Sequence, residues 1–313
     1  MLSYVGRRLA LALVTVLAAV VISFLLVHAT PGSPGAVVLG PSGTAAEIAA
    51  KNHELGWDRP LPVQFADYLG HLLRGDLGTS LIDDRSIGAD LAARLPVTAS
   101  IAILATLLSG VVGVVLGVTA AVRGGALARV LGTGSGIGLS LPAFWVGILL
   151  VYVLSLQLGL LPATGYVPLA EDPVGWLTSL VLPVLTLTVG GAAIIARTAA
   201  GGMREALGQE HIRTLRALGT PTWRIRYLHA LRFASVPVVS VLGIQFIGLF
   251  GGSVIIENLF ALPGLGQASQ AAVSAHDFPA LIGVVLVATL VVVVTNLLLD
   301  LVVAALDPKV RTA

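Results

Sequence analysis

The sequence predicts an all-α membrane protein that crosses the bilayer six times. Only 11% of its 313 residues are charged, less than half of the roughly 25% that is usual in soluble proteins. Its mean hydropathy is +0.96, and a soluble core could not bury that much apolar surface. Its charged residues also lie between long charge-free windows, each with the roughly 20 residues that a helix needs to cross a bilayer. These observations exclude a soluble enzyme, a nucleic-acid-binding protein and a secreted disulfide scaffold.

The first predicted span, near residues 9–28, follows Arg7 and Arg8 as a signal peptide would. Its apolar run is longer than the roughly 7–15 residues of a signal peptide, and no clear cleavage site comes after it. We therefore predict a retained helix that ends at the turn residues 31–35. The residues after it, 29–96, are predicted to form a long loop outside the cytoplasm.

The remaining spans are read from the other charge-free windows. Pro162 and the turn-like residues 163–165 end the third window, and the rest of that window is too short and polar for another crossing. The spans are predicted near residues 97–122, 137–161, 176–197, 236–256 and 280–305, all within a single transmembrane domain, 1–313.

The distribution of arginine and lysine predicts the orientation. Thirteen of the 18 cationic residues lie at the two termini, in the loop between the second and third spans, and in the segment that comprises Arg197 and the loop 198–235. Lys309 and Arg311 are the C-terminal pair. The other five cations lie in the loop 29–96, which is too long for the positive-inside rule to apply. We therefore predict that both termini and the loop 198–235 are cytoplasmic.

Two predicted spans contain pairs of glycines at G-x-x-x-G spacing, which allows helices to approach closely. The pairs are Gly113 with Gly117, and Gly248 with Gly252. Packing within this chain is the interpretation we favour for both pairs, and a dimer contact is the alternative.

The sequence offers no evident catalytic or metal-binding chemistry. It has no cysteine, none of its six histidines falls in the middle of a span, and no H-E-x-x-H motif occurs. Neither lysine follows a glycine, so a phosphate-binding G-x-x-x-x-G-K-[ST] loop is excluded. Asp300 lies near the end of the last span and is interpreted as an interfacial residue, with a proton relay as the alternative. The chain therefore has no evident energy source of its own and is either driven by a partner or passive.

The cytoplasmic loop 198–235 predicts two short helices around a sharp turn. Gly219 stops the first helix, and Thr220 with Pro221 caps the second. The expected apolar stripes are Leu207, His211, Leu215 and Leu218 on the first helix, and Trp223, Tyr227 and Leu231 on the second. Such a segment could dock in a groove of a soluble partner or lie on anionic lipid.

The run from Gln209 to Gly219 reads QEHIRTLRALG, and His229–Arg232 reads HALR. These residues resemble the coupling loop of ABC-importer permeases of the dipeptide and oligopeptide branch. The general superfamily pattern, E-A-A-x-x-x-G followed by I-x-L-P, is degraded here, because Arg213 stands where its Glu is expected and Arg232 where its Pro is expected. These departures are typical of the peptide branch.

The resemblance extends over nearly the whole chain. Similar motifs occur in the family's order at Tyr4–Leu9, Thr30–Gly32, Leu55–Val63, Arg74–Ser80, Arg94–Thr98, Ser140–Gly147 and Glu257–Gly266.

This resemblance implies a type I ABC importer permease in the bacterial cytoplasmic membrane that forms half of a translocation pathway. The implied partners are a second, homologous permease, two ATPase subunits that hold ATP and Mg²⁺, an extracytoplasmic substrate-binding protein and the lipid bilayer. The permease itself would bind no cofactor and no nucleic acid. The loop 29–96 would either dock the binding protein or only cap the pathway.

The resemblance also implies roles for particular residues. Gln245, Glu257 and Phe260 are candidates for the pathway or the outer gate. Hydrogen bonding within the helix interior is the alternative for Gln245, and docking of the binding protein is the alternative for Glu257 and Phe260. Coupling to the ATPases is expected from Arg213, Thr214, Leu215, Arg216, Ala217, Leu218, Gly219, Thr220, Pro221, Trp223 and Arg224.

Di- and oligopeptides are the expected substrates, and nickel chelates, glutathione or haem are the alternatives within the same machinery. A passive channel or secondary transporter is a more remote alternative.

Overall fold

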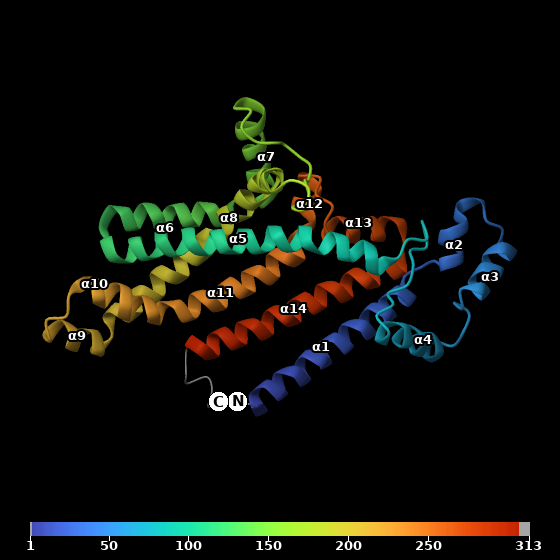
Figure 1. Ribbon diagram of the computed structural model, residues 1–313, viewed down its shortest axis with the longest axis horizontal. Coiled ribbons are helices and arrows are strands. Elements are labelled where there is room, and N and C mark those ends of the chain that lie inside the picture. The colour runs from blue at the N-terminus through green and yellow to red at the C-terminus, as the bar shows by residue number, and fades with distance from the viewer. Residues whose placement is uncertain (1, 307–313) are drawn as a thin grey trace. The chain divides into compact units, whose positions relative to one another are not determined.

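The computed structural model describes residues 2–306, and throughout this range the regular secondary structure is helical (Figure 1). The chain divides into two compact units. Unit 1 comprises Met1–Thr98 and Pro263–Val294, and unit 2 comprises Ala99–Leu262 and Thr295–Ala313. The C-terminal Lys309 and Arg311, on which part of the predicted orientation rests, lie outside the described residues.

Unit 1 contains both the first span and a largely helical 29–96 segment. Its helices are α1 (Leu2–Ala29), α2 (Pro34–Leu39), the 3₁₀ turn η1 (Gly40–Ser42), α3 (Ala45–Glu54), α4 (Leu61–Leu73), the start of α5 (Ile87–Arg123), α13 (Leu265–Ala275) and most of α14 (Phe278–Leu306). The 29–96 segment is therefore not an open loop, and α5 starts earlier than the predicted residue 97.

The core of unit 1 joins the end of α1 to the start of α14. Val27, Phe278 and Ile282 are buried together. Gly283 on α14 leaves room for Ile87 on α5, because an added Cβ would lie 2.7 Å from the Ile87 side chain. The buried Thr98 hydroxyl accepts a hydrogen bond of 2.8 Å from the backbone N–H of Leu265. These contacts join segments that are far apart in the sequence.

Unit 2 contains the remaining helices. They are the rest of α5, α6 (Gly125–Ser140), α7 (Ala143–Leu150), the π-helix η2 (Val151–Gln157), α8 (Pro173–Gly208), α9 (Glu210–Ala217), α10 (Thr222–Arg224), the π-helix η3 (Ile225–Ala230), α11 (Leu231–Gly252), α12 (Val254–Leu259) and the end of α14. The helix α8 lies at the centre of this unit and is buried along most of its length.

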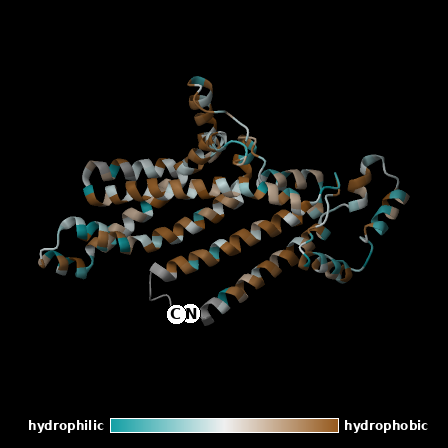
Figure 2. Ribbon diagram, in the orientation of Figure 1, coloured by the Kyte–Doolittle hydropathy of each residue, from teal (hydrophilic) through white to brown (hydrophobic). Residues whose placement is uncertain are grey.

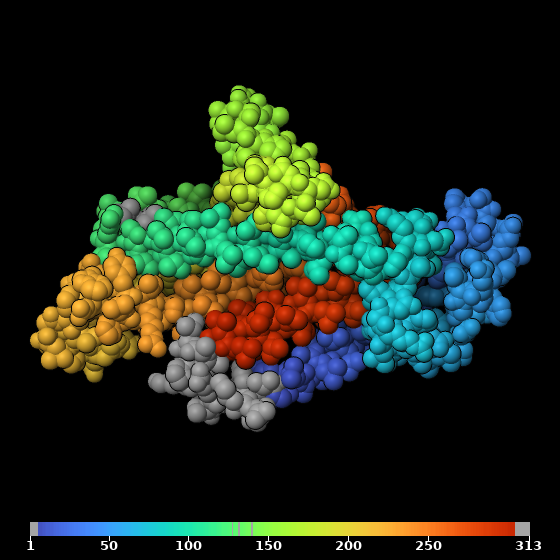
Figure 3. Space-filling model, viewed as in Figure 1, coloured from blue at the N-terminus to red at the C-terminus, as the bar shows by residue number. Residues whose placement is uncertain are grey.

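Among the described residues, five helices are long and apolar enough to cross a membrane, and the bent pair Ala128–Gly138 and Ala143–Gln157 makes six if it counts as one span. Figure 2 shows hydrophobic residues along the length of these helices. The prediction of one unbroken helix over 137–161 is wrong, since the chain bends by 100° between α6 and α7. Pro142 explains the break, because proline disfavours helical backbone at the preceding residue, and Leu141 is extended. The residues after this break form a projection on the surface of unit 2 (Figure 3).

The two glycine pairs behave differently. On α5, an added Cβ at Gly113 would lie 2.6 Å from the Cβ of Ile195, and one at Gly117 would collide with the carbonyl oxygen of Ala196. This pair packs against α8, as the favoured interpretation predicts. At Gly248 and Gly252 on α11, nothing lies within 4 Å of an added Cβ. Packing within the chain is therefore wrong for the second pair.

Candidate functional site

Residues 209–232, which we call the elbow segment, form the predicted helix, turn and second helix. The helix α9 ends in a Schellman motif, in which Gly219 N–H donates to the Arg216 carbonyl and Thr220 N–H donates to the Leu215 carbonyl, both at 3.0 Å. Gly219 has φ of +75°, a left-handed conformation that glycine adopts without a steric penalty. The backbone geometry thus requires this glycine, although its surroundings are open.

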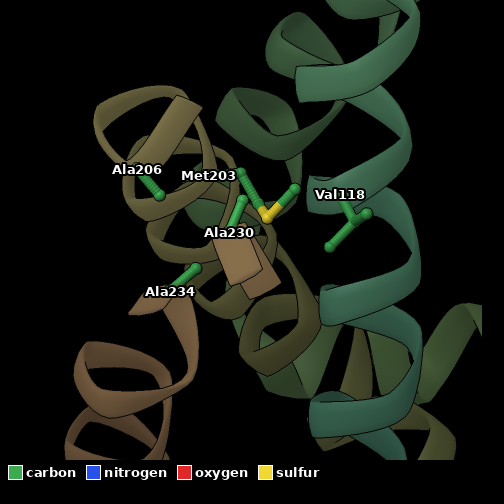
Figure 4. Packing of buried hydrophobic residues seen from close by; sticks show 5 residues of the cluster. All are labelled: Val118, Met203, Ala206, Ala230 and Ala234. Atoms are coloured by element: carbon green, nitrogen blue, oxygen red, sulfur yellow. The ribbon is translucent and has the colours of Figure 1, made fainter. Parts of the chain in front are cut away.

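Two isoleucines fix the elbow segment to the rest of unit 2. Ile212 on α9 is fully buried, and Ile225 at the start of η3 is 2% exposed. Behind them, a buried cluster joins α5, α8 and α11 and consists of Val118, Met203, Ala206, Ala230 and Ala234 (Figure 4). The predicted stripe missed Ile212, although it is the one strongly apolar residue among the polar neighbours at 209–214.

The second helix of the elbow segment is not a separate short helix, as the sequence predicted. It begins at Thr222, passes through the π-helix η3 and continues into the membrane span as one helix that ends at Gly252. The helix α8 likewise extends beyond the predicted residue 197, to Gly208. The elbow segment thus lies between two membrane helices: α8 ends directly before it at Gly208, and its second helix continues as α11.

The outward surface of the elbow segment is apolar and cationic. Leu218 is 75% exposed, Trp223 is 55% exposed and Tyr227 is 51% exposed. The guanidinium of Arg224 lies 5.4 Å from the centre of the Trp223 ring, a cation–π contact. Leu218 and Tyr227 were predicted on the apolar stripes, but the structure leaves them facing outward. Exposed apolar groups beside cations are typical of a surface that binds a partner.

All of the predicted coupling residues lie at this surface. Leu215 and Thr220 are half-buried, and the others are exposed: Arg213, Thr214, Arg216, Ala217, Leu218, Gly219, Pro221, Trp223 and Arg224.

A cavity of about 410 Å³ lies beside the elbow segment, and the only charged side chains among its lining residues are Arg216 and Arg226. Thr220 and Thr222 supply hydroxyl groups to the same lining. An acidic side chain of a partner would find complementary charge there.

Two family models match the chain. "Binding-protein-dependent transport system inner membrane component" matches residues 113–312, and its N-terminal companion, "Binding-prot-dependent transport system membrane comp, N-term", matches residues 1–102. This chain belongs to that family. It is a multi-pass permease component of an ABC transporter in the bacterial inner membrane.

Relatives of this permease match it over its full length. A "Probable peptide ABC transporter permease protein y4tP" of Sinorhizobium fredii is 37% identical, over 98% of this chain and 99% of the relative. A "Putative peptide transport system permease protein" of Brucella abortus is 36% identical over 99% of both chains. A "Glutathione transport system permease protein GsiC" of Salmonella choleraesuis is also 36% identical over 99% of both.

A solved structure of the MetNI methionine ABC transporter, in an inward-facing conformation, has the same fold as this permease. The TM-score is 0.56 at 22% identity, with 69% of this chain and 96% of that chain covered. The predicted type I importer fold is thereby confirmed.

The three pathway candidates of the permease are all buried. Glu257 is fully buried on α12, Phe260 is 1% exposed just after it, and Gln245 is 9% exposed on α11. The Phe260 carbonyl accepts a hydrogen bond of 2.9 Å from Gly165 N–H, which joins two connecting segments of unit 2. Glu257 and Phe260 are three residues apart in the sequence, and Gln245 precedes Glu257 by about three helical turns.

Gln245 is part of a polar cluster inside unit 2. Its amide nitrogen and oxygen have no hydrogen-bond partner among the described residues, and the same holds for the hydroxyls of Thr106 and Ser109 on α5. Gly191 on α8 makes room for this cluster, because an added Cβ would collide with both Gln245 and Ser109. Sequence reasoning identified Gln245 but missed Ser109 on α5, which lies beside it next to Gly191.

Among the described residues, no group of three or more His, Asp or Glu side chains is arranged to hold a metal ion. The features that stand out in the described part of the permease are the exposed apolar and cationic surface of the elbow segment and the buried polar cluster around Gln245.

Proposed function

We propose that this permease forms half of the translocation pathway of an ATP-driven importer of di- and oligopeptides. One observation carries this proposal: the elbow segment presents an apolar and cationic surface to the outside while both of its ends continue into long membrane helices. Because Ile212 and Ile225 are buried and hold the segment in place, it can transmit the movement of a bound partner to the membrane helices. The peptide substrate is inferred from the printed names of full-length relatives.

The motion is proposed to come from two ATPase subunits that bind ATP and Mg²⁺ and receive the elbow segments of two permeases. The elbow segment and both termini would then be cytoplasmic, in agreement with the arginine distribution. A substrate-binding protein would deliver the peptide on the opposite side, where the 29–96 segment of unit 1 would receive it or seal the pathway. Both units would act together as a single permease domain.

A second, homologous permease is proposed to pack against the open face of α11. Gly248 and Gly252 are exposed there; Ile244 precedes them at 69% exposure, and Ile255 follows on α12 at 61% exposure. Small residues between large apolar ones allow another helix to approach closely.

Gln245, Glu257 and Phe260 are proposed to contribute to the pathway or the outer gate. Because all three are buried, they would reach a substrate only in a conformation in which α11 and α12 have moved.

Glutathione is a second candidate substrate, because a relative of nearly equal similarity is named as a glutathione permease. Glutathione is itself a tripeptide-like molecule, so the two candidates require the same pathway chemistry.

The proposal is tested with the complete importer in liposomes, with purified ATPases, partner permease and binding protein. Gly219→Val should abolish peptide-stimulated ATP hydrolysis and uptake, because a β-branched residue strongly disfavours a φ of +75°. Gly219→Asn is the matched control, since asparagine adopts this conformation more readily, and it should retain most of the uptake. Normal transport by Gly219→Val, or ATP-independent uptake by the unchanged protein, would refute the proposal.

A further inference from the structure

The helix α4 (Leu61–Leu73) in unit 1 has three distinct faces. One face is turned into the unit and includes Gln64, Phe65 and Tyr68. A polar edge includes the exposed Asp67 and His71. The remaining face is apolar, and its residues recur at intervals of three and four: Pro62, Val63, Ala66, Gly70 and Leu73.

Contacts with α1 fix the orientation of α4. The Phe65 ring meets Phe24 edge-on at 5.2 Å, and Tyr68 stacks on the same ring at 6.2 Å. The Gln64 amide donates to the carbonyls of Trp57 at 2.9 Å and Arg59 at 2.8 Å. These two bonds turn its amide oxygen towards His28 on α1.

The bond to His28 completes this attachment. The Gln64 amide oxygen lies 2.9 Å from His28 Nε2, and the His28 ring stacks on Trp57 with ring centres 4.1 Å apart. The inward face of α4 is therefore held by several independent contacts. Its apolar outward face cannot be buried by a simple rotation of the helix.

The outward face is unusually apolar for an exposed surface. Leu73 is 80% exposed and Val63 is 44% exposed. The charged groups at the polar edge are paired with groups outside this face, since Asp67 accepts from Arg59 at 3.2 Å and His71 lies 3.0 Å from Asp76. A helix with one apolar face and one polar edge is typical of a helix that lies in a membrane interface.

The part of α1 that α4 contacts also carries exposed apolar residues. Near the end of α1 that α4 contacts, Ile22 is 55% exposed, Leu25 is 52% exposed and Leu26 is 62% exposed. Figure 1 shows α4 beside this end of α1. Since α1 is a membrane-spanning helix, lipid surrounds these residues.

We propose that α4 is an interfacial helix whose apolar face, Pro62, Val63, Ala66 and Leu73, lies among the lipids that surround the C-terminal end of α1. With the predicted orientation, these are lipids of the outer leaflet. The 29–96 segment is then attached to the membrane surface through α4, while α3 extends into water. This proposal does not depend on the identity of the transported substrate.

The experiment uses the absence of cysteine from the sequence. Single cysteines replace Val63, Ala66 and Leu73 on the apolar face of α4, and each is labelled with a nitroxide in the full-length permease in liposomes. Ala66→Cys has a matched control in Ala49→Cys, an exposed alanine on α3. Leu17→Cys, on the exposed surface of α1, provides the reference for a lipid environment.

The measurement compares collisions of each label with oxygen, which concentrates in lipid, and with a water-soluble nickel chelate. The three α4 labels should have oxygen-to-nickel ratios several-fold above that of Ala49→Cys and closer to that of Leu17→Cys. Ratios on α4 equal to that of Ala49→Cys would overturn the proposal. The proposal would also be overturned if adding the binding protein lowered the collisions of the α4 labels with both reagents to values typical of a buried label, because the face would then be a protein-docking surface. Tryptophan emission and protease resistance identify variants that fail to fold, and the remaining α4 positions then decide the outcome.

Discussion

The 29–96 segment of unit 1 and the elbow segment of unit 2 are both connections between membrane helices, but they are held in opposite ways. Many polar side chains of the 29–96 segment form hydrogen bonds within unit 1. For example, Thr44 and Glu47 form a capping box, and Ser80 donates to Asp277 at 2.5 Å. Among the described side chains of the elbow segment, one forms a hydrogen bond, from Thr214 to the Glu210 carbonyl. Its arginines and aromatic rings face outward instead.

This difference distinguishes a segment that completes its own fold from one that is completed by a partner. A change inside a self-contained region should lower the stability of the permease by itself. A change at a partner surface should leave the isolated permease intact and impair only the assembled transporter. Substitutions in the two kinds of region can separate these outcomes.

The strongest test compares the two glycine pairs of the membrane helices, because one pair packs within the chain and the other is open to a partner. Gly117→Ala places a Cβ against the Ala196 carbonyl, so α5 and α8 must move apart, with an expected cost of about 3 kcal/mol. Gly248→Ala meets open space and should leave the stability of the isolated permease unchanged or slightly raised. Thermal unfolding in detergent measures both. Equal destabilisation by the two substitutions would contradict the distinction between an inner and an outer pair.

A second test removes an internal contact of unit 1. Asp277 is 5% exposed, and its carboxylate accepts from Ser80 and from the backbone N–H of Leu81. Asp277→Ala leaves these donors without their charged acceptor and should cost about 2 kcal/mol. Limited proteolysis should then cut the 29–96 segment faster.

The control for this test is Asp84→Asn. Asp84 is exposed and has φ of +55°, a conformation that asparagine also adopts. The interpretation of Asp277 as an internal anchor fails if both variants are cut at the same rate as the unchanged protein.

A third test concerns the partner surface. Trp223→Ala removes an exposed ring that packs little within the chain, so the unfolding temperature should stay within the range of surface substitutions. Uptake by the assembled importer should fall about tenfold, which corresponds to about 1.4 kcal/mol of lost coupling. Ile212→Ala provides the contrast, because the loss of this fully buried anchor should lower both stability and uptake. A large loss of stability in Trp223→Ala would show that the elbow segment is self-contained after all.

The sequence was sufficient for the features that depend on local chemistry. Charge-free windows predicted the membrane helices, and Gly219 followed by Thr220 and Pro221 predicted the turn of the elbow segment. The sequence was insufficient for the features that depend on tertiary contacts. The bend at Pro142 lies inside an apolar window that could equally continue as a helix, and the open surroundings of Gly248 differ from those of Gly117 at the same spacing. Ile212 stands out as the one strongly apolar residue at 209–214, but the helices against which it packs cannot be identified from that local pattern.

The smallest expected effect is a dependence of the 29–96 segment on acid. The Arg85 side chain, which donates to Asp83 at 2.7 Å, lowers the pKa of that carboxyl to about 2. The pKa of Asp76 is also lowered, first by the backbone N–H of Gly78 and then by His71. Because both folded pKa values lie below the ordinary value of 3.8, these contacts are present above that pH; those of Asp83 are lost as the pH falls through about 2, and those of Asp76 are lost at a pH below 3.8.

Amide hydrogen exchange tests this dependence at the two donors. After correction for the intrinsic effect of pH on exchange, the N–H of Arg85 should lose protection as the pH falls towards about 2, and the N–H of Gly78 should lose it at a pH below 3.8, since each donates to one of these carboxylates. Asp83→Asn should abolish the change at Arg85 and leave the change at Gly78, because Asp76 titrates separately. Both carboxylates are exposed to water, so solvent screens their contacts and the change should stay local. A simultaneous loss of protection at Ile212 in the elbow segment would mean that acid unfolds the permease as a whole. The acid response of the 29–96 segment could then not be attributed to the contacts of Asp76 and Asp83.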